Sequence, residues 1–343
     1  MHLRKLGSSD IMMPAIGLGT WSVFDTDNDR EWLAAEALAA GVNLFDSSPM
    51  YGQAEDSLAR ALGNRRPESI IATKVSALDA ETGDAQIAHS LSLFGTIDLL
   101  QIHNIVSWQL HLPRLERMKN EGTIKAIGAS QGLLVSDDAF EEIMRTGMLD
   151  SIQIRYNPKR QEAADRILPF AQDMGIGVLI MQPLRWGVLL ASPTAQELDE
   201  LGADSWGAAV LRWILSNPCV TTVLTTTATP GRITANASVG AMPPYVPEQM
   251  DLVQTILVRG HSTGTDGARR TADEIVHAVK VFLTARLGAC FCDICIAREF
   301  ASTVAEAAIV RQSLPVEHFA SEQGPCLGCG NTGPVARSRT IMR

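Results

Sequence analysis

Residues 41–62 read GVNLFDSSPMYGQAEDSLARAL, and this stretch decides the prediction of the fold. It begins with the short apolar run 42–45, becomes polar at Asp46, and ends in the helical periodicity of residues 54–62. A strand followed after a short loop by an amphipathic helix is the repeating unit of parallel α/β proteins. The stretch therefore predicts one such unit, with polar residues in the loop between strand and helix.

The same unit recurs between about residues 14 and 240. Seven more apolar runs occur at 15–19, 69–74, 97–103, 124–130, 151–157, 177–182 and 219–224. Helical periodicity appears at 30–40, 110–120, 137–146, 162–173, 205–216 and 230–238, and only weakly near 83–95. Eight strands close a (β/α)8 TIM barrel of the α/β class, which is the predicted fold. A doubly wound sheet is the alternative, but GLGTW at 17–21 lacks its phosphate-binding GxGxxG pattern.

Length, composition and charge restrict the class of protein. The chain has 343 residues, of which 46% are hydrophobic, so one barrel and a smaller module can both be accommodated. A net charge of −9 argues against broad binding to nucleic acid, which requires clustered basic residues. The N-terminus lacks a secretory signal pattern, and no apolar stretch is long enough to cross a membrane. We therefore predict a cytoplasmic protein without a membrane partner.

The C-terminal part of the chain has a different character. Residues 259–271 are rich in Gly, Ser, Thr and charge and predict a linker between a barrel at 1–258 and a module at 272–343. Helical patterns at 272–288 and 296–313 predict a small, mainly helical module. A protein or nucleic-acid partner of this module stays open, since three arginines lie close to the C-terminus.

Four cysteines of this module form two CxxC pairs. They are Cys292 with Cys295, and Cys326 with Cys329. Two such pairs often bind structural zinc through four thiolates, and a small module gains folding free energy from the metal. We therefore predict a zinc site, with redox cysteines or plain buried thiols as the alternatives.

Polar side chains follow three neighbouring predicted strands. Asp46 ends the run 42–45 and Tyr51 follows in the next loop, Lys74 ends the strand at 69–74, and His103 ends the strand at 97–103. Catalytic groups of a parallel barrel gather at the carboxyl ends of its strands. Each residue alone has an ordinary reading as a cap, a solvated side chain or a loop residue. Together they predict a catalytic site.

Carbonyl reduction suits these four side chains. Hydride addition leaves negative charge on the carbonyl oxygen, so a proton donor is required there. Tyr51 would be that acid, and the Lys74 ammonium would lower its pKa. Asp46 would hold Lys74 in place, and His103 would orient the carbonyl group.

The sequence resembles the aldo-keto reductase family over about residues 1–258. The matching stretches are GLGTW, GVNLFDSSPMYGQAEDSLARAL, IIATK, IDLLQIHN, EGTIKAIGAS and the Q-x-x-Y-N of residues 153–157. The resemblance implies a TIM barrel that reduces a small-molecule aldehyde or ketone with a nicotinamide cofactor. The catalytic tetrad of the family maps onto Asp46, Tyr51, Lys74 and His103.

The resemblance also implies a set of cofactor-binding residues. Those holding the nicotinamide and its ribose would be Gly19, Thr20, Asp46, Ser130, Gln131 and Gln153. Those near the pyrophosphate would be Gln182, Leu184 and Arg185. At the adenosine end, Arg232 would contact the 2′-phosphate and Asn236 the adenine, which favours NADP. The three threonines at 225–227 stand where the family often has a lysine, so NAD stays open.

The resemblance further suggests a substrate pocket and a second class of function. Trp21, Met50, Asn104 and Trp108 would line the pocket, whose apolar walls suit a small aldehyde or ketone. Barrels of this family can also serve as cofactor-binding regulatory or sensor subunits, in this case docked through the C-terminal module. A zinc-dependent alcohol dehydrogenase is disfavoured, because the CxxC pairs lie outside the predicted barrel.

Overall fold

A computed structural model describes residues 1–132, 135–184, 188, 191–262, 279, 283, 291–293, 296, 304–314, 319–326 and 332–338. The chain divides into two compact units, Met1–Gly264 and Thr265–Arg343. In the described part of the chain, no helix combines the length and the apolar character needed to cross a membrane.

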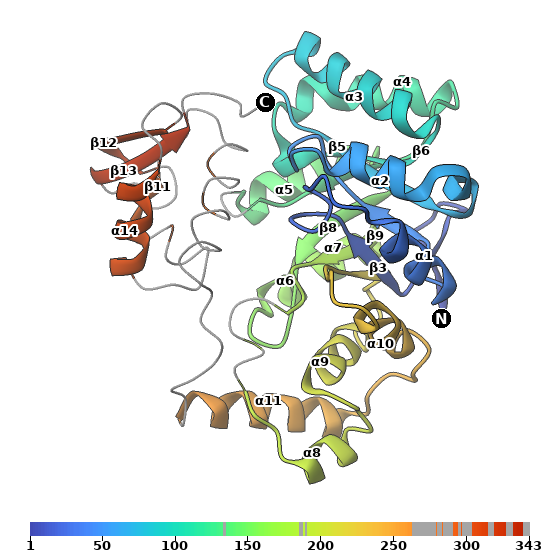
Figure 1. Ribbon diagram of the computed structural model, residues 1–343, viewed down its shortest axis with the longest axis vertical. Coiled ribbons are helices and arrows are strands. Elements are labelled where there is room, and N and C mark those ends of the chain that lie inside the picture. Colours follow the sequence, from blue (N-terminus) through green and yellow to red (C-terminus); the bar gives the residue numbers. More distant parts are fainter. Residues whose placement is uncertain are drawn as a thin grey trace. The chain divides into compact units, whose positions relative to one another are not determined.

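The first unit contains a closed parallel barrel of eight strands (Figure 1). Around the barrel the strand order is β10-β3-β4-β5-β6-β7-β8-β9, so neighbours in sequence are neighbours in space and β10 closes the ring against β3. The strands are β3 (Ile16–Gly19), β4 (Leu44–Asp46), β5 (Ile70–Val75), β6 (Ile97–Ile102), β7 (Ile124–Ser130), β8 (Ser151–Arg155), β9 (Gly177–Met181) and β10 (Thr222–Thr225). All eight coincide with predicted strands, which confirms the TIM barrel.

Alternation of side chains along the strands separates an apolar layer inside the barrel from a polar one. A buried interior cluster contains Leu44, Ala72, Leu99, Ala126, Leu179 and Leu224. Side chains two residues further along a strand point to the same face. Asp46, Lys74 and Gln101 therefore lie above Leu44, Ala72 and Leu99, toward the carboxyl ends of the strands. The apolar layer therefore lies directly beneath the polar site inside the barrel.

An N-terminal hairpin that the sequence did not predict packs against this apolar layer. Strands β1 (Leu3–Lys5) and β2 (Met12–Pro14) pair antiparallel, and Leu6 and Met13 belong to the interior cluster. Gly7 in the hairpin has φ +56°, and a Cβ there would meet the Gly175 carbonyl oxygen at 2.2 Å. Only glycine fits this approach, because other residues rarely adopt positive φ and would clash with the backbone.

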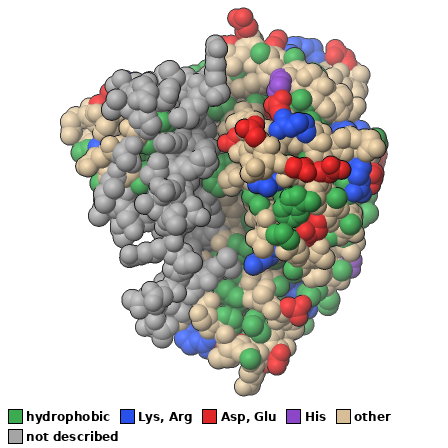
Figure 2. All heavy atoms as spheres, viewed as in Figure 1, with side chains coloured by type: hydrophobic (Ala, Val, Ile, Leu, Met, Phe, Trp, Pro, Cys, Tyr) green, Lys and Arg blue, Asp and Glu red, His purple; other side chains and the backbone are tan. Residues whose placement is uncertain are grey.

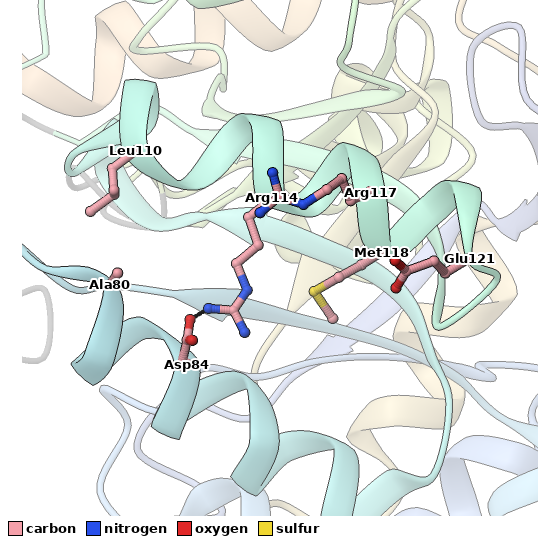
Figure 3. Close-up of a pocket in the computed structure, with 7 residues that line it drawn as sticks. All are labelled: Ala80, Asp84, Leu110, Arg114, Arg117, Met118 and Glu121. Atoms are coloured by element: carbon pink, nitrogen blue, oxygen red, sulfur yellow. Dashed lines mark ion pairs between the residues drawn. The ribbon is translucent and has the colours of Figure 1, made fainter.

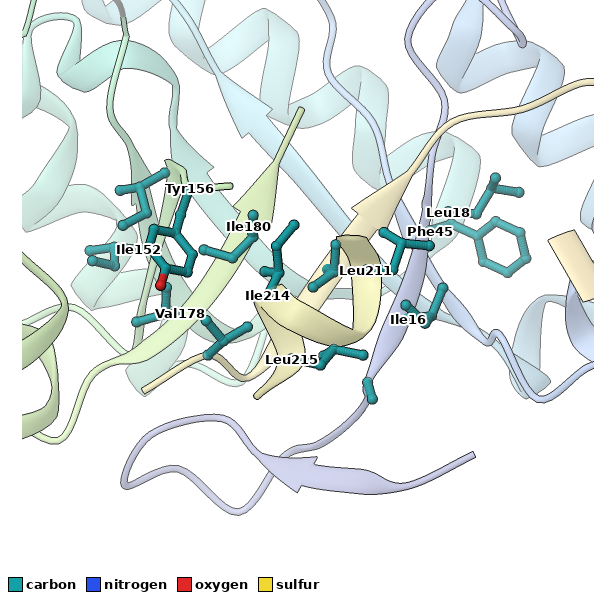
Figure 4. Close-up of a cluster of buried hydrophobic side chains, with 14 of the residues drawn as sticks. Ile16, Leu18, Phe45, Ile152, Tyr156, Val178, Ile180, Leu211, Ile214 and Leu215 are labelled. Carbon is teal, nitrogen blue, oxygen red and sulfur yellow. The ribbon is translucent and has the colours of Figure 1, made fainter. Parts of the chain in front are cut away.

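Helices surround the barrel and bury its outward-facing side chains. They are α1 (Glu31–Ala39), α2 (Ala54–Leu62), α3 (Ala80–Phe94), α4 (Trp108–Asn120), α5 (Asp137–Met144), α6 (Glu162–Asp165), α7 (Ile167–Asp173), α8 (Ala195–Glu200), α9 (Trp206–Leu215), α10 (Arg232–Val239) and α11 (Pro247–Ser262). Figure 4 shows Leu211, Ile214 and Leu215 of α9 beside side chains of neighbouring strands such as Ile180 and Val178. This packing covers the outward-facing side of these strands.

The helices differ from the prediction at four places. The weakly periodic third connection forms the 15-residue helix α3, which Asp79 caps by accepting a hydrogen bond from the Thr82 amide. The predicted helix at 162–173 is divided into α6 and α7 at Arg166, and α8 was not predicted. Helix α11 extends to Ser262, inside the segment predicted as the linker. The boundaries of the linker stay a prediction.

The second unit contains an antiparallel sheet that the sequence missed. Its order is β11-β13-β12, formed by β11 (Phe291–Cys292), β13 (Thr332–Ser338) and β12 (Phe319–Pro325). Helix α14 (Val304–Ser313) overlaps the predicted helix at 296–313. The expected mainly helical module is therefore corrected to one that includes a sheet. Gly324 and Pro325 end β12, and Gly333 and Pro334 lie near the start of β13, so in the sequence this region has the composition of a turn or loop.

Charged side chains of both signs are mixed on the part of the surface that can be described. On the face shown in Figure 2, acidic and basic side chains of the described residues are interspersed with apolar and neutral surface.

Candidate active site

The four predicted catalytic residues come together at the carboxyl ends of adjacent strands. Asp46 ends β4, Lys74 lies near the end of β5, and His103 follows β6 directly. Tyr51 lies in the loop between β4 and α2. The Lys74 Nζ is 5.2 Å from the centroid of the Tyr51 ring, and the rings of Tyr51 and His103 meet edge to face at 6.0 Å.

A buried ion pair forms the centre of the site. Lys74 Nζ lies 2.9 and 2.8 Å from the two carboxylate oxygens of Asp46, and it donates to the Ser47 carbonyl at 2.7 Å. The two residues are only 1% and 3% exposed. Burial disfavours the ammonium, but the charge of Asp46 and the nearby Tyr51 outweigh it and raise the pKa of Lys74. Lys74 is therefore a fixed positive charge beside the phenol.

Two glutamines complete the surroundings of Asp46. Gln101 Nε2 donates to Asp46 Oδ1 at 3.0 Å, and Gln153 Nε2 donates to Oδ2 at 3.2 Å. The carboxylate thus accepts hydrogen bonds from three buried side chains of three strands. This arrangement holds Asp46 and Lys74 in one geometry.

The pKa of Tyr51 is set by burial more than by the neighbouring charges. Desolvation is the largest influence and raises the pKa above its ordinary value of 10.0, while the charge of Lys74 lowers it and that of Asp46 raises it. From the sequence we expected the Lys74 ammonium to lower this pKa, and its charge does act in that direction. The net shift is nevertheless upward, because burial penalises the phenolate and the Asp46 carboxylate offsets part of the ammonium charge.

The upward shift of the Tyr51 pKa predicts the pH dependence of the reaction. If Tyr51 is the acid, reduction requires the protonated phenol, so its rate should hold through neutral pH and fall only as pH rises through a value above 10.0. Alcohol oxidation requires the phenolate and should increase over that same range. Profiles of kcat/KM against pH in both directions check this, and a loss of reduction near neutral pH would contradict it.

The loop that carries Tyr51 is held by a close contact. Gly52 has φ +61°, and a Cβ at this position would lie 2.2 Å from a carboxylate oxygen of Asp25. The same carboxylate accepts a hydrogen bond from the Gln53 amide at 3.0 Å. Because Gly52 leaves room for Asp25, the loop is fixed immediately after Tyr51.

The end of β6 is held in a similar way. Ser48 Oγ lies 3.4 Å from Nδ1 of His103, and the amide of Asn104 donates to Ser130 Oγ at 2.8 Å. Asn104 has φ 54°, a left-handed conformation that asparagine tolerates better than most residues. These contacts fix the position of the imidazole next to Tyr51.

The predicted nicotinamide-binding residues lie on β3, β4, β7 and β8 or directly after these strands. Gly19 ends β3, and the Thr20 hydroxyl donates to Ser47 Oγ at 2.9 Å. The Gln131 amide donates to the Gln153 carbonyl at 2.9 Å, next to Ser130. Among the described residues, the Gln153 side-chain oxygen is a buried acceptor without a hydrogen-bond partner. A carboxamide –NH2 could satisfy it, so these residues fit a nicotinamide.

Sequence reasoning missed Gln101 and Arg155. Gln101 lies two residues before His103, and Arg155 two residues after Gln153, so the alternation along β6 and β8 could have indicated both. Arg155 Nε donates to Gln182 Oε1 at 3.1 Å, and Nη1 donates to the Gln131 carbonyl at 3.1 Å. Arg155 thereby connects two predicted cofactor-binding residues.

A model of the aldo/keto reductase family matches residues 15–258 of the chain. The chain belongs to this family. It is therefore an NAD(P)H-dependent oxidoreductase with the family's TIM barrel. Among its relatives, the NADH-specific methylglyoxal reductase of Escherichia coli is 30% identical over 235 residues, which cover 57% of this chain and 71% of the relative. The D-threo-aldose 1-dehydrogenase of a Pseudomonas species is 26% identical over 304 residues, covering 68% and 92%.

Solved structures show the same fold. An aldo-keto reductase from Bacillus halodurans in its holo form superposes with a TM-score of 0.63 at 23% identity, covering 75% of this chain and 96% of that one. An aldo/keto reductase from Klebsiella pneumoniae in complex with NADP and acetate gives a TM-score of 0.65 at 20% identity, covering 74% and 95%. At these identities the likeness concerns the fold alone.

Of the predicted pyrophosphate and adenosine residues of this aldo/keto reductase, Gln182 and Leu184 come after β9, and Arg232 and Asn236 lie on α10. Gln182 follows β9, Leu184 packs on the core, and Arg185 lies outside the described residues. Arg232 is exposed at the start of α10, and Asn236 is partly exposed one turn later. Arg232 and Asn236 thus lie on the same short helix.

The predicted substrate residues of the reductase are all partly exposed. Trp21 follows Thr20, Met50 precedes Tyr51 and its amide donates to Ser48 Oγ at 3.2 Å, and Asn104 follows His103. Trp108 opens α4. Three of the four are therefore sequence neighbours of predicted site residues.

A separate groove lies between α3 and α4, in the helical layer. Its volume is about 410 Å³, and Figure 3 shows Asp84 of α3 paired with Arg114 of α4 inside it. The lining residues are Ala80, Asp84, Leu110, Arg114, Arg117, Met118 and Glu121. None is a predicted site residue, so this groove is not the candidate active site.

Proposed function

We propose that the protein reduces a small aldehyde or ketone to an alcohol, with Tyr51 as the general acid and NADH or NADPH as the hydride donor. The observation that carries the proposal is the buried Lys74–Asp46 pair below the Tyr51 ring, with His103 at the ring's edge. A charged pair is expensive to bury, and such perturbed groups cluster at functional sites. Their position at the strand ends supports catalysis.

Each residue of the site has a separate role in this proposal. The cofactor, when bound, supplies a hydride to the carbonyl carbon. Tyr51 gives its proton to the carbonyl oxygen and becomes a phenolate, which solvent later reprotonates. Lys74 stabilises that phenolate, and Asp46 keeps Lys74 charged and in place. His103 orients the carbonyl oxygen toward the phenol.

The chemistry of the relatives indicates where to look for substrates. One relative is named for methylglyoxal and another for an aldose, and both are small oxygenated carbonyl compounds. We therefore propose that the substrates are short aldehydes and ketones. The substrate pocket would be lined by Trp21, Met50, Asn104 and Trp108.

Steady-state oxidation of NADH and NADPH with a panel of short aldehydes tests this function. We expect turnover of at least one aldehyde that depends on enzyme concentration. Tight binding of cofactor without turnover of any carbonyl would favour the alternative, a regulatory or sensor subunit.

At the adenosine end, we propose that Arg232 contacts the 2′-phosphate when NADPH binds. Arg232→Ala should then weaken NADPH binding by about 1.5–3 kcal/mol, as for a lost hydrogen bond to a charged group, with little effect on NADH. Titration of both cofactors by fluorescence measures this. An equal loss for both cofactors would mean that Arg232 does not recognise the 2′-phosphate.

A structural zinc site in the second unit is a separate proposal. Two of the four predicted ligands lie close together, since the Cys292 amide donates to Cys326 Sγ at 3.2 Å. Cys295 and Cys329 lie outside the described residues, and the described ones include no group of three metal-ligating side chains. Reduced thiols would be required, in keeping with the predicted cytoplasmic location.

Metal analysis of the full-length protein tests the zinc proposal. We expect one zinc per chain, lost in Cys326→Ser, since zinc sites of this type require four ligands. Cys219→Ser is the matched control, because Cys219 belongs to the first unit and should not affect the metal. Zinc absent from the wild-type chain would rule out the site.

A further inference from the structure

Glu36 of α1 reaches across to the N-terminus of α10. Its Oε2 accepts a hydrogen bond from the Gly231 amide at 3.1 Å. Its Oε1 accepts one from the Thr234 amide at 3.2 Å and one from the Thr234 hydroxyl at 3.1 Å. A single carboxylate therefore uses two backbone donors at the positive end of the helix dipole.

This carboxylate lies on the helix proposed for the adenosine end of the cofactor. Arg232 is the first residue of α10 and lies between Gly231 and Thr234, the two partners of Glu36. The loop before α10 has threonines at 225–227 and no lysine or arginine before Arg232. Within residues 225–239 the charged side chain is the exposed guanidinium of Arg232, and Glu36 brings a carboxylate to this segment.

The two forms of the cofactor differ at this end by one phosphate group. A 2′-phosphate carries nearly two negative charges at neutral pH and seeks free N–H donors and cations. At α10 the carboxylate occupies two donors and repels a second anion. A 2′-hydroxyl is neutral and can itself donate a hydrogen bond to a carboxylate.

We infer that Glu36 is a specificity-determining residue that makes the reductase prefer NADH over NADPH. The inference rests on the proposed function for the location of the adenosine end. Arg232 acts in the opposite direction and keeps NADPH a weaker alternative cofactor. Glu36 acts by occupying the helix N-terminus that a phosphate would otherwise use.

Equilibrium binding tests this inference without any turnover. Dissociation constants for NADH and NADPH are measured by fluorescence titration of the full-length wild type, Glu36→Gln and Glu36→Ala. Displacement by adenosine 2′,5′-bisphosphate and by 5′-AMP isolates the contribution of the 2′-phosphate. Glu31→Gln is the matched control, since it removes the same charge from the exposed start of α1.

We expect the wild type to bind NADH more tightly than NADPH. Glu36→Gln should tighten the binding of NADPH and of the bisphosphate roughly tenfold and change the binding of NADH by less than about threefold. A tenfold change is the order expected when one nearby negative charge is removed from the site of an anion. If Glu36→Gln folds poorly, Glu36→Ala serves in its place and should shift the ratio of the NADH and NADPH dissociation constants in the same direction. Glu31→Gln should leave the ratio of the two dissociation constants unchanged.

Several outcomes would overturn the inference. They are a wild type that prefers NADPH, a Glu36→Gln variant with an unchanged ratio, or an equal loss of both cofactors, which would make Glu36 a purely structural cap. Failure to bind either nucleotide would overturn it together with the proposed function. Binding with the expected ratio but no turnover of any carbonyl would support the inference and contradict only the catalytic proposal.

Discussion

Tyr51→Phe should lower kcat/KM for aldehyde reduction by about 10²- to 10⁴-fold, the usual contribution of a general acid. The variant keeps the ring that meets His103 edge to face and loses only the hydroxyl that would protonate the substrate oxygen. Cofactor affinity should stay within about twofold, because the phenol acts on the carbonyl group and not on the cofactor. Steady-state kinetics and cofactor titration measure the two effects separately.

Tyr156→Phe provides the matched control for this change. Tyr156 belongs to the apolar core and its hydroxyl accepts a hydrogen bond from Asn217 at 3.3 Å. Tyr156→Phe also loses a phenolic oxygen, so any effect of this variant on the rate reports a change in packing and not the loss of acid catalysis. Retained turnover in Tyr51→Phe would remove Tyr51 as the acid.

Lys74→Met should impair both activity and stability. Removing the ammonium leaves the carboxylate of Asp46 buried without its cation, which typically costs about 3–5 kcal/mol of folding free energy. Reduction should be lost as well, because the phenolate that forms on Tyr51 would have no positive charge beside it. Urea unfolding and steady-state kinetics measure the two losses.

A double variant separates the two roles of Lys74. Lys74→Met combined with Asp46→Asn removes the unpaired charge, so it should recover stability while reduction stays lost. Lys119→Met is the control, since its ion pair with Asp150 at 2.7 Å is partly exposed and should contribute at most about 1 kcal/mol. Reduction that recovers along with stability would mean that Lys74 is only structural.

The barrel and the site could be predicted from the sequence because both follow from local patterns. Eight apolar runs alternating with amphipathic segments are sufficient for a closed parallel sheet. Parallel strands end at one mouth, so Asp46, Lys74 and His103 had to meet there. The alternation along β6 and β8 would also have indicated Gln101 and Arg155, had it been applied to every strand.

The features that were missed depend on contacts distant in sequence. The N-terminal hairpin is stabilised by the barrel interior, and the sheet of the second unit pairs strands that have glycine and proline near one end. The direction of the Tyr51 pKa shift depends on burial, which residue types alone do not give. The Glu36 contact joins α1 to α10, about 195 residues later in the chain. A local pattern of residues in the sequence cannot predict a contact between such distant residues.

Transfer of deuterium from the cofactor tests the central claim most directly. The full-length protein is incubated with methylglyoxal and NADH that carries deuterium at both C4 positions of the nicotinamide ring, and the products are analysed by mass spectrometry. We predict an alcohol with one deuterium on the former carbonyl carbon, formed by the wild type and by Tyr156→Phe but not by Tyr51→Phe. Equal amounts of labelled alcohol from wild type and Tyr51→Phe would contradict the catalytic role assigned to this site.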